Sequence, residues 1–159
     1  MIQCRIDWQR GEADFLNLRY HRSHRWTFDG GAVVVASSSP EIVPVPMSDE
    51  TAVDPEEAIV ASLSSCHMLW FLAIAAKGGF TVDSYRDDPC GVMSRNERGR
   101  LFVSDVTLRP NVTFGGASRP SDEQLAKMHH DAHGECFLAN SVTSVIRVEP
   151  QNQAPDSSR

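Results

Sequence analysis

The stretch DPEEAIVASLSSCHMLWFLAIAAKGG, residues 54–79, decides the fold. It opens with a capping residue, Asp54, followed by a proline at the first helical position and two glutamates in the first turn. It closes with a lysine and two glycines. These residue types favour the two ends of a helix. The sequence therefore predicts a helix that starts at residues 54–57, runs through 58–76 and ends at 77–79.

The predicted helix carries no formal charge between residues 58 and 76, with histidine taken as neutral. A membrane span needs about 20 apolar residues, so the stretch nearly qualifies by length. Its flanks lack a basic bias, and its middle is polar, with Ser62, Ser64, Ser65, Cys66 and His67. We therefore expect a helix that is buried all round, inside the core or in a dimer interface.

Strand-forming residues precede the helix, in runs at 15–20, 26–28 and 32–35. The Asp29-Gly30-Gly31 sequence between the last two runs is a hairpin-turn signal, because glycine adopts positive φ without steric cost. We therefore expect the chain to open with a β-hairpin within residues 13–35. Residues 37–54 contain three prolines and predict an extended loop.

The chain after the helix combines strands with a second helix. Short strand-like runs lie at residues 80–85, 91–93, 101–108 and 111–114. Residues 121–124 predict the start of a helix that covers 125–133 and continues toward 138, and residues 141–148 predict a final strand. This order predicts an α+β fold with an antiparallel sheet and two main helices. We expect a single domain over residues 1–150 and a polar tail over 151–159.

The composition argues against several classes of function. The 159 residues include 15 basic and 21 acidic side chains, which gives a net charge of −6. Nucleic-acid binders and proteins that bind anionic membranes use basic surfaces, so we expect neither partner. No apolar run follows a basic start, so no signal peptide is expected. The four scattered cysteines do not form a disulfide scaffold, and we expect a reducing, cytoplasmic location.

Two cysteines are candidates for chemistry. Cys66 lies in the middle of the apolar helix, where it is either a small buried hydrophobe or a nucleophilic thiolate activated by a nearby cation. Cys136 follows the second helix, and spacing alone does not pair it with Cys66. Cys4, near the terminus, and Cys90, in a predicted turn, are interpreted as bystanders.

Histidines gather on the second helix. His129, His133 and Cys136 lie at i, i+4 and i+7, on one face of a continuous helix, and His130 lies beside them. Three interpretations remain open at this point. The residues form a polar helix face, or they bind zinc, or His133 tunes the pKa of the Cys136 thiol.

Charged residues around the first helix have ordinary explanations. Glu56 and Glu57 favour a helix N-terminus through the helix dipole. Arg19, Arg22 and Arg25 lie three apart in and near the predicted hairpin, where they fit a solvated surface. Residue types alone assign none of them to a site.

Several motifs together resemble the osmotically induced protein C / organic hydroperoxide resistance (OsmC/Ohr) family. The shared features are the Asp54-Pro55-Glu56-Glu57 helix start, the small-residue run that ends at Cys66, the Gly79-Phe80 pair and the late cysteine Cys136. The resemblance covers residues 15–150.

The resemblance implies an OsmC-like intertwined homodimer in which an antiparallel sheet wraps two central helices. It implies a cysteine peroxidase that reduces organic or lipid hydroperoxides without a metal or other cofactor. By position, Cys66 would be the peroxidatic thiol, and Cys136 would be the resolving thiol that forms a disulfide with it. A dithiol, such as a lipoylated protein, would restore the enzyme.

The resemblance also implies an arginine and a glutamate that assist the thiolate. Glu56 matches the family glutamate, but it lies ten residues before Cys66. That spacing is ~15 Å along a straight helix, so Glu56 would act on the Cys66 of a partner chain or through a bend. In one branch of the family the arginine lies in a Gly-Gly-Arg-Asp-Gly turn, and the turn at residues 29–32 lacks it. Another branch places it in the loop before the helix, and residues 37–54 contain no arginine. Arg22 and Arg25, just ahead of the turn, are therefore the candidates.

Apolar side chains of the first helix, such as Met68, Trp70 and Phe71, are expected to select an apolar peroxide. Two other functions stay open. One is a binding module of the same fold for an apolar small molecule, with little peroxidase activity. The other is a metal site formed by His129, His133 and Cys136, with or without Cys66.

Overall fold

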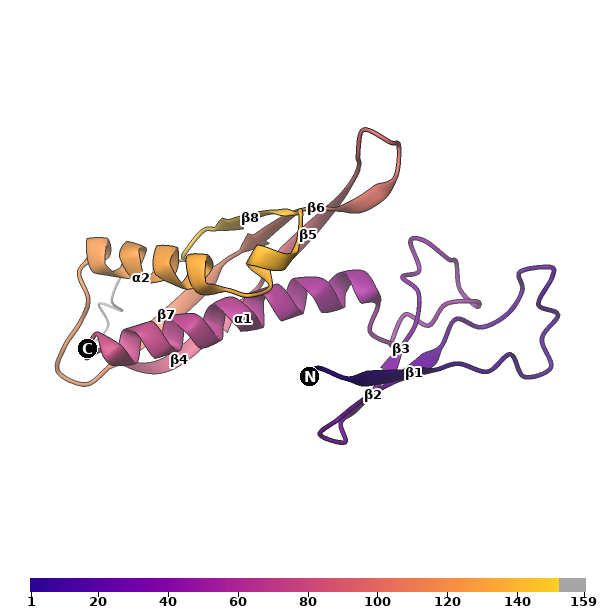
Figure 1. The fold of residues 1–159 in the computed structure, drawn as a ribbon, viewed down its shortest axis with the longest axis horizontal. Coiled ribbons are helices and arrows are strands. Elements are labelled where there is room, and N and C mark those ends of the chain that lie inside the picture. Colours follow the sequence, from indigo (N-terminus) through magenta and orange to yellow (C-terminus); the bar gives the residue numbers. More distant parts are fainter. Residues whose placement is uncertain (152–159) are drawn as a thin grey trace, which may run out of the picture. The chain divides into compact units, whose positions relative to one another are not determined.

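The computed structural model describes residues 1–151, so most of the predicted tail, 152–159, lies outside the described residues. The chain folds as two compact units, Met1–Ile59 and the part that begins at Val60. The first unit holds a small sheet and long loops, and the second holds paired helices and two further sheets (Figure 1).

The first unit contains an antiparallel sheet of β1 (Cys4–Asp7), β2 (His24–Phe28) and β3 (Val33–Ala36). Strands β2 and β3 form a hairpin within the predicted range, and Gly31 in its turn has a φ of 86°. The predicted strand at 15–20 is wrong, because this segment is a loop in which Leu18 has a φ of 64°. Its aromatic residues meet each other instead of a neighbouring strand: the Phe15 and Tyr20 rings stack with centroids 4.6 Å apart.

Helix α1 (Pro55–Lys77) starts and ends as predicted. Asp54 Oδ1 accepts a hydrogen bond from the backbone N–H of Glu57 at 2.7 Å, which caps the first turn. Gly79, just beyond the helix, has a positive φ of 79°. The buried residues of α1 form a single stripe: Leu63, Ser64, His67, Phe71 and Ala75.

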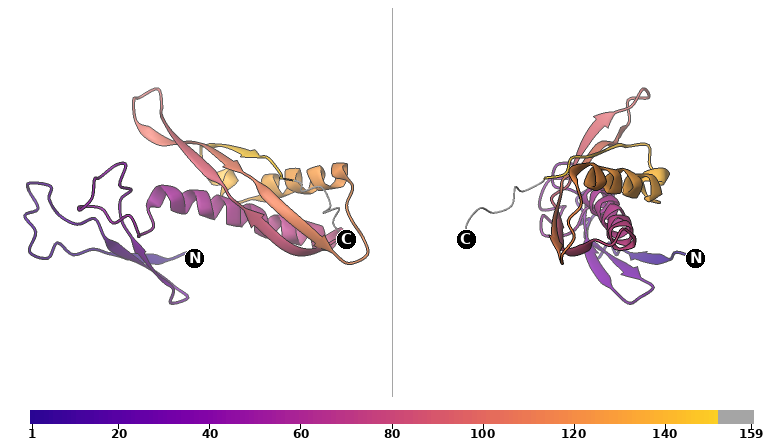
Figure 2. Two further views of the ribbon diagram at one scale, coloured as in Figure 1. Left: turned by 180° about the vertical axis from the view of Figure 1, so that it is seen from behind. Right: turned by 90° about the vertical axis from the view of Figure 1, so that its left-hand side faces the viewer.

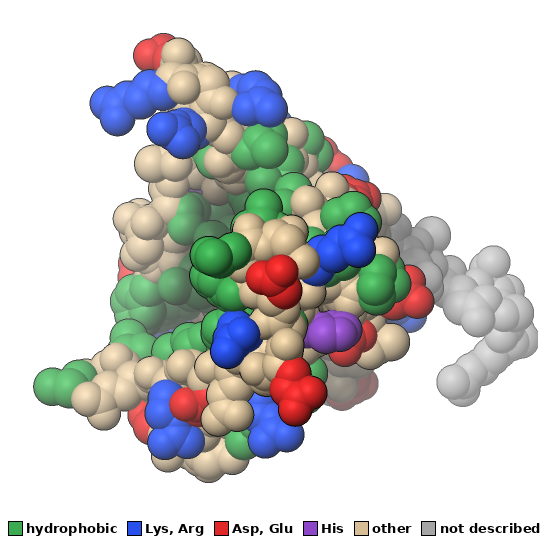
Figure 3. Space-filling model, turned by 90° about the vertical axis from the view of Figure 1, so that its right-hand side faces the viewer, with side chains coloured by type: hydrophobic (Ala, Val, Ile, Leu, Met, Phe, Trp, Pro, Cys, Tyr) green, Lys and Arg blue, Asp and Glu red, His purple; other side chains and the backbone are tan. Residues whose placement is uncertain are grey.

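The single chain does not bury α1 all round. Leu69 keeps 61% of its surface exposed. By length and composition α1 could cross a membrane, a test that the core helices of water-soluble proteins also pass. Hydrophobic side chains lie open at the surface between charged ones (Figure 3). The burial expected all round this helix is therefore not met within the single chain, and the dimer-interface alternative stays a prediction.

The second unit pairs its strands in two sheets. Strands β4 (Thr81–Asp87) and β7 (Pro110–Gly115) form one antiparallel sheet. Strand β5 (Cys90–Arg95) pairs antiparallel with β6 (Leu101–Leu108), which also pairs with β8 (Val145–Val148). The β6–β8 pair is parallel, a departure from the antiparallel expectation. Parallel pairing requires a crossover, and the chain between β6 and β8 supplies one that contains the second helix.

Helix α2 (Asp122–Glu135) ends earlier than position 138 and is followed by the short 3-10 helix η1 (Ala139–Ser141). Its N-terminus has a capping box, in which Ser121 and Gln124 bond each other's backbone N–H groups. Helices α1 and α2 lie side by side against the β4–β7 sheet (Figures 1 and 2). The buried centre of this packing consists of Phe71, Ala75, Met128 and Ala132.

Candidate functional site

The structure brings Cys66 and Cys136 into contact. Cys66 lies in the middle of α1 and is half-buried, whereas Cys136 is the C-cap of α2 and is only 2% exposed. Both are free thiols. Burial, together with a hydrogen bond to the Cys66 thiol, raises the pKa of Cys136 above its ordinary value. The spacing of the two residues in the sequence did not predict this contact.

The end of α2 shapes the surroundings of Cys136. Its backbone leaves the helical region at φ −66° and ψ 111°, so the chain turns away from α2 at this residue. The backbone N–H of Ala139 donates a hydrogen bond to Cys136 Sγ at 3.4 Å. Cys136 is therefore a protonated thiol held beside a more accessible one, an arrangement in which the two sulfurs can be joined by oxidation.

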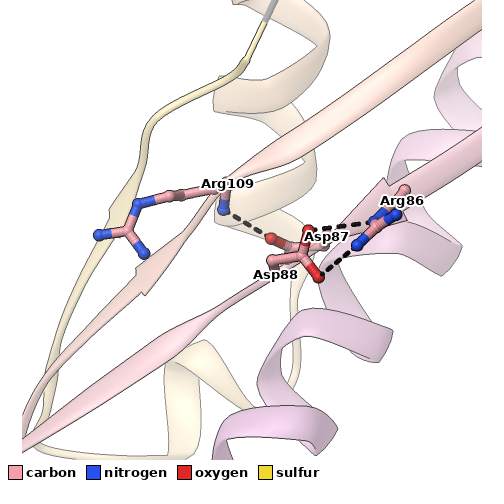
Figure 4. Close-up of polar contacts among 4 residues, drawn as sticks. All are labelled: Arg86, Asp87, Asp88 and Arg109. Atoms are coloured by element: carbon pink, nitrogen blue, oxygen red, sulfur yellow. Dashed lines mark hydrogen bonds and ion pairs between the residues drawn. The ribbon is translucent and has the colours of Figure 1, made fainter.

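The helix that carries Cys66 is anchored two residues away from it, at Ser64. Ser64 donates a hydrogen bond to Asp87 Oδ2 at 2.5 Å, at the end of β4. Asp87 Oδ1 accepts a second hydrogen bond, from the backbone N–H of Arg109 at 2.6 Å (Figure 4). Arg86 turns instead to Asp88, with an Nε–Oδ2 distance of 3.0 Å. The Ser64–Asp87 hydrogen bond therefore ties α1 to the end of β4.

A guanidinium contacts a different thiol. Arg109 Nη1 donates to Cys90 Sγ at 3.2 Å, and both side chains are exposed. Cys90 begins β5 and Arg109 follows β6, and the register of the two strands brings them together. The sequence predicts Cys90 to be a bystander in a turn and carries no signal for this pair.

A cavity of about 450 Å³ lies within the first unit. Its walls include three aromatic rings: Tyr20 lies 5.5 Å from Trp8 and 4.6 Å from Phe15, measured between ring centroids. The other lining residues are Arg22, His24, Ser37, Ser38, Pro55 and Glu56. Because most of these walls are carbon, the cavity suits an apolar ligand.

The cavity brings together Arg22 and Glu56, two of the predicted site residues. The Arg22 guanidinium lies 3.9 Å from the Tyr20 ring centroid. Its Nη1 donates to the carbonyl of Leu18 at 2.8 Å and to that of Tyr20. These contacts hold the cation at the cavity wall. Among residues 1–151, no ion pair joins Arg22 to Glu56.

Other predicted residues lie elsewhere. Arg25 is exposed on β2 and does not line the cavity. Phe71, expected as a wall of the peroxide site, is fully buried in the helix core. Trp70 packs edge to face against Phe137, with centroids 5.6 Å apart. Two rings of the aromatic wall observed instead, Phe15 and Tyr20, come from the loop that was predicted as a strand, and the third is Trp8.

The histidines do not gather into a metal site. His129 is buried and bonded to His67 of α1, whereas His130 is exposed. Within residues 1–151, no group of three or more histidine, cysteine, aspartate or glutamate side chains is arranged to hold a metal ion. The predicted alternative of a metal site therefore has no support from the geometry. His133 acts on His67, whose pKa it helps to lower, and its carbonyl accepts the N–H of Cys136 at 3.3 Å.

Comparison with known proteins connects this geometry to a family. Residues 48–151 match the family model of OsmC-like proteins. An OsmC-like protein of unknown function from Vibrio cholerae is 49% identical, with a TM-score of 0.93 over 95% of this chain and 99% of that one. No curated protein matches the chain.

More distant structures share the fold. An organic hydroperoxide resistance protein from Elizabethkingia anophelis is 14% identical, with a TM-score of 0.69 over 96% of this chain and 95% of that one. Another, from Bacillus subtilis, is 15% identical, with a TM-score of 0.65 over 96% of this chain and 98% of that one. The predicted α+β, OsmC-like fold is confirmed. By its family match and its high identity to the Vibrio cholerae protein, this chain belongs to the OsmC-like protein family.

Proposed function

We propose that this protein is a thiol-dependent peroxidase that reduces organic hydroperoxides through a disulfide cycle of Cys66 and Cys136. The contact between these two thiols carries the proposal, since one is accessible and the other buried. Two hydroperoxide resistance proteins share the fold, which supports the class of substrate. No cofactor is required, because the two sulfurs supply both electrons.

The first step is attack by Cys66. Its thiolate attacks the peroxide O–O bond, which breaks and leaves a sulfenic acid on Cys66 and an alkoxide that takes up a proton to become an alcohol. Cys66 performs this step because it is more accessible than Cys136. A thiolate is required, and a nearby cation favours it.

The second step is resolution by Cys136. Its sulfur attacks the sulfenic acid, a disulfide forms, and the hydroxide that leaves combines with the Cys136 proton to give water. The raised pKa of Cys136 keeps this thiol protonated until Cys66 is oxidised. A dithiol reductant, such as a lipoylated protein, then exchanges with the disulfide and restores both thiols.

The cavity with Arg22 and Glu56 is proposed as the peroxide-binding part of the site. Glu56 and Cys66 lie ten residues apart on the continuous helix α1, a separation of ~15 Å that their side chains do not bridge. We therefore propose a homodimer in which the cavity of one protomer serves Cys66 of its partner. A guanidinium there would stabilise the thiolate and the departing alkoxide. A reducing, cytoplasmic location is proposed with this cycle.

One experiment tests the cycle directly. The reduced protein is treated with one equivalent of cumene hydroperoxide and analysed by mass spectrometry. We expect a loss of two hydrogens, mapped to a Cys66–Cys136 disulfide. Cys66→Ser should abolish turnover, and Cys136→Ser should allow about one turnover before Cys66 is overoxidised. Cys90→Ser, which removes a thiol outside the proposed cycle, is the matched control and should keep full activity.

The competing function is a binding module for an apolar small molecule, favoured by the same aromatic cavity. It predicts saturable binding of an apolar ligand that Cys66→Ser leaves unchanged, and thiols that survive minutes of peroxide treatment. Full peroxidase activity in Cys66→Ser would contradict the disulfide cycle.

A further inference from the structure

A pair of buried histidines joins the two helices that carry the cysteines. His67 of α1 is 1% exposed and His129 of α2 is 4% exposed. His67 Nε2 and His129 Nδ1 are 3.1 Å apart, and the two rings are parallel within 4°. Phe71 stacks on His129, with ring centroids 4.3 Å apart and ring planes 25° apart. The peroxidase cycle uses neither imidazole.

The pair is neutral and incompletely satisfied. Burial lowers the pKa of both imidazoles to about 4, so each carries a single N–H near neutral pH. One N–H makes the bond between the rings. Among the described residues, neither His67 Nδ1 nor His129 Nε2 has a hydrogen-bond partner.

Stability alone does not account for such a pair. The net contribution of one hydrogen bond to stability is small, and each buried polar atom without a partner costs at least as much as one such bond contributes. An apolar pair of the same shape would therefore be as stable or more stable. The best-attested use of a buried polar pair in a helical interface is to select one register.

The position of the pair explains why register matters here. His67 follows Cys66 directly on α1, and α2, which carries His129, ends at Cys136. A disulfide tolerates Cα separations of about 4.4–6.8 Å, a window narrower than the rise of two helical residues, at about 1.5 Å each. The surrounding contacts of Phe71, Ala75, Met128 and Ala132 are apolar and therefore non-directional. The histidine bond is directional, and a slide of one residue would break it.

We propose that His67 and His129 are positioning residues whose hydrogen bond fixes the register of α1 against α2, so that the Cys66 and Cys136 thiols stay in contact. The inference rests on the proposed function only in taking these two cysteines as the reacting pair. It predicts that an apolar replacement of the pair keeps the fold but weakens disulfide formation.

The test measures the Cys66–Cys136 equilibrium in glutathione buffers, with Cys4 and Cys90 replaced by serine. No peroxide is used, so the result stands whether or not the protein reduces peroxides. The apolar variant is His67→Leu with His129→Leu. We expect its melting temperature to stay at or above that of the parent protein. We expect its equilibrium constant for disulfide formation to fall about tenfold, which corresponds to about 30 mV.

Two control variants separate register from general packing. His67→Gln with His129→Asn keeps hydrogen-bonding atoms near the Nε2 and Nδ1 positions and should restore the equilibrium constant to within about twofold of the parent value. Phe71→Leu weakens the same core but keeps both histidines and their bond. Phe71→Leu should lower the melting temperature without changing the constant.

The proposal fails if the leucine pair keeps the parent equilibrium constant. It also fails if the equilibrium constant for disulfide formation falls as far in the glutamine–asparagine pair as in the leucine pair, or if it falls as far in Phe71→Leu. Should the leucine pair not fold, His129→Leu alone removes the same bond and carries the test with the same expected fall.

Discussion

Ser64 and Asp87 are joined by a 2.5 Å hydrogen bond that ties helix α1 to the end of β4. Because Asp87 also accepts the backbone N–H of Arg109, this carboxylate connects the helix of Cys66 to the end of β4 and to the residue between β6 and β7. Ser64→Ala removes one donor from a charged acceptor, and we expect a loss of ~1–3 kcal/mol in the free energy of unfolding. Urea denaturation measures it. Ser65→Ala, at the exposed neighbouring position, is the control and should change stability by less than ~0.5 kcal/mol.

The buried histidine pair predicts a loss of stability in mild acid. Both imidazoles have folded-state pKa values of about 4, below the ordinary 6.5. Between these two values the unfolded chain binds protons that the folded chain does not, so the free energy of unfolding falls as the pH drops from 6.5 to 4. The full stability is present above pH 6.5, where both states are neutral.

Melting temperatures measured across this pH range check the acid prediction. The leucine pair at positions 67 and 129 lacks these two titrating groups and should show a shallower decline. Equal slopes in the two proteins would show that other groups cause the acid loss.

The two candidate arginines give a matched comparison. Arg22 lines the aromatic cavity with Glu56, whereas Arg25 is exposed on β2. Arg22→Lys removes the planar guanidinium, and we expect kcat/KM for cumene hydroperoxide to fall about 100-fold. Arg25→Lys should leave it unchanged. A loss in Arg25→Lys with none in Arg22→Lys would move the peroxide site away from the cavity.

Two glycines are expected to respond to alanine with opposite signs. A Cβ on Gly91 would lie 2.7 Å from Val60 Cγ2, so Gly91→Ala forces side chains apart and should destabilise by ~1–3 kcal/mol. Gly134 lies in α2 with nothing within 4 Å of its Cβ position. Gly134→Ala should therefore stabilise by ~0.5–1 kcal/mol, since alanine favours helices. Thermal melts of both variants test these signs.

Local signals predicted the helices well. The bounds of α1 follow from Asp54, Pro55 and the glycines after Lys77, all of which act within one turn of the chain. The start of α2 follows from the Ser121–Gln124 capping box for the same reason. The prediction of a strand at residues 15–20 was wrong, because the same pattern of aromatic residues also fits an aromatic cluster within a loop.

The site depended on contacts that sequence spacing does not encode. Arg22 and Glu56 were carried over from a family resemblance, and only the folded loops place both at one cavity. The His67–His129 bond joins residues 62 positions apart in the chain and leaves no periodic signal. The parallel β6–β8 pairing is long-range as well, and its register is set by the crossover between the two strands.

The hydrogen bond from the Ala139 amide to Cys136 Sγ makes a backbone proton a reporter of oxidation. In the reduced protein this amide is held by a thiol sulfur. A bridge to Cys66 replaces the S–H bond of this sulfur with an S–S bond, so the acceptor that the Ala139 amide meets is changed. We therefore expect hydrogen–deuterium exchange of the Ala139 amide to differ between the reduced and the oxidised protein, without any label on the cysteines themselves.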